Sequence, residues 1–348
     1  MDMELSPRIE LLGGRVVINP FELLSRSRAK EGDVVVLSGT LLEGFGNLYS
    51  DLDLYVISER LPKKAPGVPT TLVLREDGRV RRINETLAIS TNILLDVQYY
   101  TFRELDTLAR SLHTLYQESR LSTRIYRKTL HHEDEDLIHK LLTGKVLQNS
   151  AADFKPREIF DRAKFCFLKY RNESGGYAEF RDLMGSWSAG DLDTCLYNMR
   201  TYLISQVSGM MFLAGNSNPR PKWFVRRLAS LEPQFSELRN GVMQWMNAPQ
   251  GTDAQKRKAV ETACELIDLT FSHTRNLLTT NPQYFSVEQA LMLTEQNFAE
   301  HAVQDRDAQA ERQLLRRMFS DSESPLLAQL LGPSHRMLRV DTSYAPAH

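Results

Sequence analysis

The chain has 348 residues, enough for two domains of ordinary size that each bury an apolar core without disulfides or structural metals. Apolar residues make up 42% and charged residues 25%, which excludes a disordered, fibrous or membrane chain and indicates an ordinary soluble protein. The 43 Lys and Arg against 44 Asp and Glu leave a formal charge of -1, so the chain lacks the global basic field that dominates binding of long nucleic acids.

The three cysteines do not form a disulfide or zinc pattern. Cys166, Cys195 and Cys264 are odd in number, widely spaced and set among apolar residues, as expected of buried free thiols in a reducing compartment. The N-terminus has no cationic start followed by an apolar run, and no stretch is long and apolar enough to span a membrane. We therefore expect a cytoplasmic protein without a membrane partner.

The first third of the chain has the composition of short strands separated by turns. Each strand is rich in β-branched or aromatic residues and bounded by Gly, Asp, Pro or Asn. The predicted strands are 33–38, 51–58, 70–74 and 91–100. A proline-rich surface loop is expected at 61–69 and a tight turn at 76–78. These elements predict a small mixed sheet.

Helical periodicity replaces the strand pattern from about Thr101 onward. The clearest case starts near Leu192, where apolar residues recur at steps of three and four up to Met211. The remaining helices are expected near 102–117, 134–143, 156–172, 222–230, 252–278, 286–301 and 305–318. The predicted fold class is therefore α+β, with a small mixed-sheet domain at 1–118, an all-helical domain at 119–338 and a loose tail at 339–348.

Two acids on the second predicted strand carry the chemistry of the chain. Side chains at i and i+2 of a strand point to the same face, so Asp51 and Asp53 project together while Leu52 and Leu54 face the core. Two adjacent carboxylates are unfavourable unless a cation neutralises them, and Mg²⁺ takes oxygen ligands from one or two carboxylates plus substrate phosphates.

A third acid, Asp96, lies inside the apolar run Ile93–Val97 of the last predicted strand. An acid within a strand otherwise built for burial is costly without a partner. A metal shared with Asp51 and Asp53 would supply one. The strand order that this requires does not follow from the sequence.

The segment from Val35 to Ile57 resembles the signature of the DNA polymerase β nucleotidyltransferase superfamily. That signature has a glycine and a small hydroxyl residue, then about ten residues to an acid-x-acid strand, then a third acid on a later strand. Gly39, Thr40, Asp51, Asp53 and Asp96 match it, although the family usually has Ser where this chain has Thr40. The resemblance covers residues 33 to 100, and the helical remainder is similar to the extensions of small-molecule nucleotidyltransferases such as the aminoglycoside-modifying enzymes.

The resemblance implies catalytic and metal-binding roles for the three acids. Asp51 and Asp53 would bind two Mg²⁺ or Mn²⁺ ions, and Asp96 would help hold one of them and orient or deprotonate the acceptor hydroxyl. Gly39 would let the backbone approach the phosphates, with Ser38 or Thr40 as hydrogen-bond donors.

A basic cluster near Trp223 is a further candidate. Lys222 is similar to a lysine-tryptophan element of the helical domains in that family, and it could reach the triphosphate from a helix start. A solvated basic face beside a core tryptophan explains the same residues. His139 and Lys140 could likewise line the site or form only the polar side of a helix.

We therefore expect a nucleotidyltransferase that moves an NMP from an NTP, with ATP as one candidate, to a hydroxyl of a small or short acceptor and releases pyrophosphate. Near-neutral charge favours a small molecule over a long nucleic acid. A noncatalytic nucleotide-binding or regulatory protein of the same fold, or a transferase acting on protein or RNA or making a second messenger, stays open. The sequence also leaves the acceptor, the preferred base and the oligomeric state open.

Overall fold

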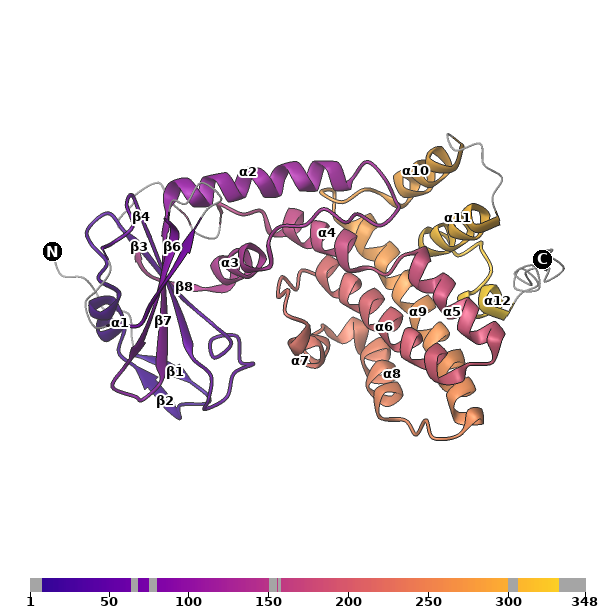
Figure 1. Ribbon diagram of the computed structural model, residues 1–348, viewed down its shortest axis with the longest axis horizontal. Helices are drawn as coiled ribbons and strands as arrows, with labels where there is room; N and C mark the ends of the chain where they lie inside the picture. Colours follow the sequence, from indigo (N-terminus) through magenta and orange to yellow (C-terminus); the bar gives the residue numbers. More distant parts are fainter. Residues whose placement is uncertain are drawn as a thin grey trace, which may run out of the picture. The chain divides into compact units, whose positions relative to one another are not determined.

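The computed structural model describes residues 8–63, 68–74, 80–149, 155, 158–299 and 306–331 (Figure 1). The chain divides into two compact units. Unit 1 comprises Met1–Thr114, Leu130–Arg162 and Ser217–Trp223, and unit 2 comprises Leu115–Thr129, Ala163–Asn216 and Phe224–His348. The predicted turn at 76–78 and the predicted tail at 339–348 lie outside the described residues.

Among the described residues, unit 1 is built on a six-stranded mixed sheet with the strand order β5-β6-β7-β4-β3-β8. The strands are β3 (Val34–Ser38), β4 (Leu52–Ser58), β5 (Thr70–Leu74), β6 (Val80–Ala88), β7 (Leu94–Thr101) and β8 (Lys145–Asn149). β4 and β7 run parallel, and the other neighbouring pairs are antiparallel. β3 and β4 are the most buried strands because they carry near-continuous apolar runs, as central strands do.

A two-stranded hairpin and several helices complete the described part of unit 1. The hairpin pairs β1 (Ile9–Leu11) with β2 (Val16–Ile18). Helix α1 (Pro20–Ser27) contacts β4 and β8, and α3 (His132–Thr143) contacts β3, while α2 (Phe102–Ser119) crosses the boundary between the units. The short η1 helix (Pro221–Trp223) also belongs to unit 1.

The described residues of unit 2 form helices joined by loops, with no strand among them. Its elements are α4 (Arg162–Glu173), α5 (Tyr177–Ala189), α6 (Leu192–Leu213), α7 (Phe224–Ala229), η2 (Pro233–Phe235), α8 (Ser236–Asn247), α9 (Asp253–Thr280), α10 (Val287–Ala299), α11 (Arg306–Phe319) and α12 (Leu326–Leu331). The long helices α6 and α9 pack side by side and form the centre of its core (Figure 1). The three cysteines are free and buried, as predicted.

The α+β class and the mixed sheet are confirmed, but several predicted boundaries are not. Strands do not stop at Thr101, because β8 pairs with β3 at the edge of the sheet. The helix predicted at 156–172 begins at Arg162. The sequence patterns also did not predict β1, β2, α1, α5, α8 or α12. The predicted domain boundary at 118 differs from the observed division, since residues 130–162 and 217–223 fold with the sheet.

Within the described residues, no helix combines the length and the apolar character needed to cross a bilayer.

Candidate active site

The structure brings two of the predicted acids together at the centre of the sheet. β4 and β7 are parallel neighbours, and their register places Asp53 directly opposite Asp96. Leu52 and Leu54, on the other face of β4, are 0% exposed, which confirms the predicted alternation. The exposed Asp51 lies immediately before β4, and its charge is one of the causes that raise the pKa of Asp96.

Crowding of these carboxyls is visible in their electrostatics. Burial raises the pKa of Asp53, and the neighbouring charges of Asp51 and Asp136 raise it further. Burial likewise raises the pKa of Asp96, with additional contributions from Asp51 and Asp53. Thr86, opposite Asp96 on β6, donates a hydrogen bond of 2.7 Å to its Oδ1. The site therefore concentrates negative charge that a bound cation would relieve.

Lys140 is the cation nearest to Asp53 among the described ion pairs. Its Nζ lies 2.9 Å from Asp53 Oδ2 and 3.9 Å from Oε1 of Glu43. The Lys140 side chain is only 9% exposed, so the ammonium is committed to this site and does not belong to a solvated helix face. Of the two interpretations left open for Lys140, the structure favours the one that lines the site. The sequence could not separate the two interpretations, because Asp136, His139, Lys140 and Thr143 recur at steps of three and four, as on the polar face of a helix.

Gly39 lies directly against the side chain of Asp53. It has a φ of +115°, which L side chains rarely adopt, and a Cβ there would lie 2.9 Å from Asp53 Oδ2. The turn that follows is closed by hydrogen bonds from Leu42 N and Glu43 N to Gly39 O. Ser38 is 1% exposed and lies opposite Asp53, so the half-buried Thr40 is the more accessible of the two predicted hydroxyl donors.

We expect Gly39→Ala to destabilise the protein by about 3 kcal/mol, because it adds a contact with the Asp53 carboxylate to a backbone strain of about 1–3 kcal/mol. Gly44→Ala is a matched control, since Gly44 also has a positive φ (+75°) but no atom lies within 4 Å of its added Cβ. Gly44→Ala should lose only about 1 kcal/mol. Urea denaturation of both variants measures the difference, and equal losses would contradict the close approach of Gly39 to Asp53.

The acids would supply only part of the coordination shell of a hard cation, with phosphate oxygens or waters supplying the rest. No group of three or more His, Cys, Asp or Glu side chains in the described parts of the chain is arranged to hold a metal ion on its own. Mg²⁺ commonly uses one or two carboxylates, with phosphate oxygens and waters completing its shell. The oxygen donors of Asp51 and Asp53 fit that pattern, and the crowded negative charge favours it.

A hydrogen-bonded network surrounds the turn and links it to α3 and to residues 217–223. His139 lies 3.0 Å from Glu43 Oε2 through Nε2 and 2.9 Å from Ser217 Oγ through Nδ1. Asn218 Nδ2 donates to the same Glu43 oxygen at 3.1 Å. One turn before His139 on α3, Asp136 makes a bidentate ion pair with Arg220. Glu43 was not predicted from the sequence, because a single acid in a short turn has no distinctive pattern.

Lys222 does not approach the acids. It is exposed, and its Nζ lies over the ring of Trp223 at 5.1 Å from the centroid. Trp223 also contacts Phe45, which lies in the turn that follows Gly39, and the two ring centroids are 5.9 Å apart. These contacts fit the alternative in which the lysine belongs to a solvated face beside a tryptophan, so a phosphate role for Lys222 stays a proposal.

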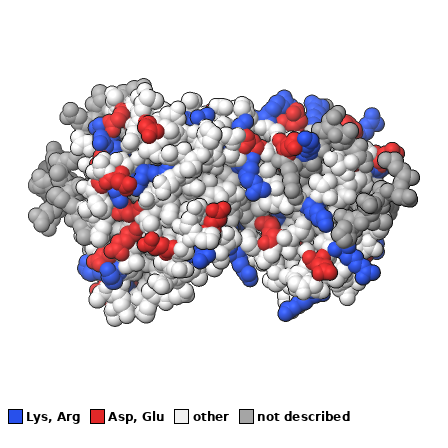
Figure 2. Space-filling view, turned by 180° about the vertical axis from the view of Figure 1, so that it is seen from behind, with Lys and Arg blue, Asp and Glu red and all other residues white. Residues whose placement is uncertain are grey.

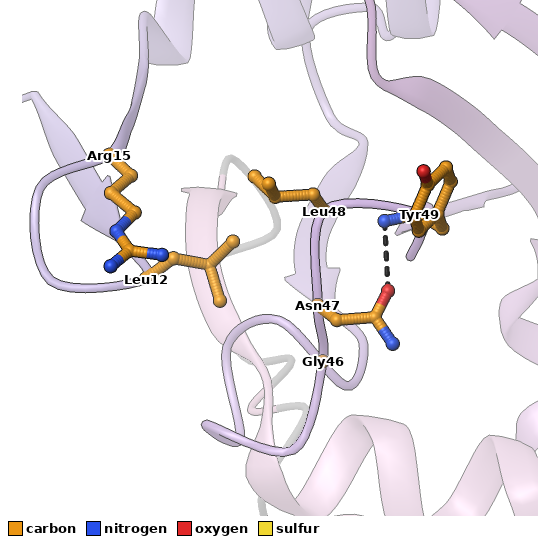
Figure 3. Close-up of a pocket in the computed structure, with 6 residues that line it drawn as sticks. All are labelled: Leu12, Arg15, Gly46, Asn47, Leu48 and Tyr49. Carbon is orange, nitrogen blue, oxygen red and sulfur yellow. Dashed lines mark hydrogen bonds between the residues drawn. The ribbon is translucent and has the colours of Figure 1, made fainter.

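A shallow pocket of about 520 Å³ lies beside the loop that leads into Asp51. It is lined by Leu12, Arg15, Gly46, Asn47, Leu48 and Tyr49. Figure 3 shows Leu48 and Tyr49 extending in opposite directions from this loop, with Asn47 Oδ1 accepting a hydrogen bond from Tyr49 N at 2.8 Å. None of Asp51, Asp53 and Asp96 lines this pocket.

No protein family model matches the chain, and no curated protein matches it in sequence. Among solved structures, the chain is similar to a nucleotidyltransferase-like protein from Exiguobacterium sibiricum 255-15, with a TM-score of 0.37 and 10% sequence identity. The likeness covers 80% of this chain and 89% of that chain. A TM-score this low supports no statement about function, so the function is inferred from the residues of the site.

Proposed function

We propose that the chain is a metal-dependent nucleotidyltransferase of the polymerase β type. The observation that carries the proposal is the pairing of Asp53 with Asp96 on adjacent parallel strands, directly against Gly39. An acid-x-acid strand, a third acid beside it and a glycine turn beneath it are the parts that the sequence resemblance implies. Chance placement of acids on two central strands is disfavoured by strand propensity and by the cost of burial.

In this proposal Asp51 and Asp53 hold Mg²⁺ or Mn²⁺ together with the phosphate oxygens of an NTP. The bound metal supplies charge neutralisation on the attacking and leaving oxygens. Asp96 is placed to orient the acceptor hydroxyl and to accept its proton, and its raised pKa suits a proton acceptor. Lys140 offsets charge on the triphosphate, and the turn after Gly39 holds the phosphates.

The reaction forms a bond between the acceptor oxygen and the α-phosphorus and breaks the bond from that phosphorus to the β-phosphate bridge. The hydroxyl proton passes to Asp96, and pyrophosphate leaves. ATP is the first NTP to test. Lys and Arg are interspersed with Asp and Glu on the face that Figure 2 shows. The formal charge of -1 supports a small acceptor over a long nucleic acid.

A second candidate is a nucleotide-binding or regulatory protein of the same fold without catalysis. The ion pair between Lys140 and Asp53 favours it, because an ammonium already neutralises the acid that would bind the metal. The presence of all three acids favours the enzyme, since a noncatalytic chain has no need of a charge cluster that is costly to bury.

The deciding experiment incubates the purified protein with each NTP, labelled at the α-phosphate, and Mg²⁺ or Mn²⁺, with and without cell extract. Label on a non-nucleotide product is the expected result and leads to the acceptor. Labelled nucleotide products without extract would indicate an oligonucleotide or second-messenger synthase instead. Tight binding of the metal-NTP complex without transfer would support the noncatalytic candidate, and absence of NTP binding would overturn both.

A further inference from the structure

The two carboxylate oxygens of Glu43 differ in their contacts. Its Oε2 contacts His139 Nε2 and Asn218 Nδ2 at 3.0 and 3.1 Å. Its Oε1 is buried and has no hydrogen-bond partner among the described residues. Burial opposes ionisation of this group, but its contacts with His139, Lys140 and Asn218 outweigh that effect and lower its pKa. A buried carboxylate oxygen without a donor is costly and asks for a partner.

The ammonium of Lys140 is placed between that open oxygen and Asp53. It contacts Asp53 Oδ2 at 2.9 Å and stands 3.9 Å from Glu43 Oε1. A displacement of about 1 Å would bring it to hydrogen-bond distance of Glu43. A divalent ion bound to Asp53 would repel the ammonium from its present position, since like charges at such distances are unfavourable.

We propose that Glu43 is a positioning residue that receives the Lys140 ammonium when a metal ion occupies Asp53. The inference rests on the proposed nucleotidyl transfer. Glu43 belongs to the turn that follows Gly39. An ammonium that moves from Asp53 to Glu43 therefore stays beside the predicted phosphate site and does not turn out to solvent. His139 and Asn218 keep the receiving oxygen aimed at Lys140 by fixing the other one.

A double-mutant cycle on Mg²⁺ binding tests this role without relying on turnover. Calorimetric titration with Mg²⁺ alone should show about tenfold weaker binding for Glu43→Gln, because the displaced ammonium loses its receiving carboxylate. Lys140→Met should bind Mg²⁺ more tightly than wild type, since the competing cation is gone. In the Lys140→Met background, Glu43→Gln should then have no further effect. Glu59→Gln, an exposed acid of the same unit, is the matched control.

Thermal denaturation in EDTA shows whether each variant folds. A Glu43→Gln effect that persists in the Lys140→Met background would overturn the inference and show a merely structural contribution. Unchanged Mg²⁺ affinity in Glu43→Gln, with wild type still transferring label, would refute it and leave the proposed function intact. If wild type binds neither Mg²⁺ nor its NTP complex, the proposed function itself fails.

Discussion

Asp53→Asn is expected to lower label transfer from the NTP by at least about 10³-fold while the protein stays folded. The amide keeps the shape of the side chain but loses the charge that would bind the metal. It also removes a buried carboxylate whose pKa is raised by burial, so the folded state loses little electrostatic stabilisation. Initial rates of label transfer, with thermal denaturation alongside, measure both effects.

The control for this variant is Asp106→Asn, which removes a carboxylate that is 66% exposed and paired only with Arg110 in the described ion pairs. It should leave transfer unchanged. A loss of less than tenfold in Asp53→Asn would show that the acid is not a metal ligand in catalysis. A comparable loss in Asp106→Asn would point to an effect of net charge.

Lys140→Met should destabilise the metal-free protein by about 3 kcal/mol at pH 7, because it leaves Asp53 buried without its cation. Millimolar Mg²⁺ should recover part of that loss by supplying a cation at the same carboxylate. Urea denaturation with Mg²⁺ or with EDTA measures the difference. Lys30→Met, which removes an exposed lysine of unit 1, should show neither effect.

The pH dependence of the Lys140→Met loss has a definite sign. Burial already holds the folded pKa of Asp53 above its ordinary value, and removal of the ammonium raises it further. The loss should therefore be absent below the ordinary Asp value of about 3.9, where the carboxyl is protonated in both folded and unfolded chains. It should grow as the pH rises through the folded pKa. A loss that does not vary between pH 4 and 8 would contradict the ion pair.

Local patterns in the sequence were sufficient for the strand that carries the acids. The alternation of Asp51 and Asp53 with the buried Leu52 and Leu54 depends only on the two-residue period of a strand. The long apolar periodicity of α6 is equally local and was predicted within two residues. Gly39 was singled out by the family resemblance, and the structure gives it a φ of +115°.

Short elements escaped prediction because they hold too few residues to show a period. β1, β2 and β8 have three to five residues each, and β8 is only partly buried, so neither alternation nor an apolar run marks it. Its place is decided by pairing with β3, more than a hundred residues earlier in the chain. The assignment of residues 130–162 to the sheet unit follows from that contact.

Some features of the candidate site follow from local sequence, and others depend on contacts between distant segments. The sequence alone predicted that Asp51 and Asp53 project together and that Asp96 lies in an apolar strand. The folded chain was needed to show that Asp96 stands opposite Asp53, that the ammonium beside Asp53 comes from Lys140, and that Lys222 lies over the ring of Trp223. The physical reason is that strand register and the direction of a buried lysine depend on contacts between distant segments, whereas periodicity is a property of neighbours in the chain.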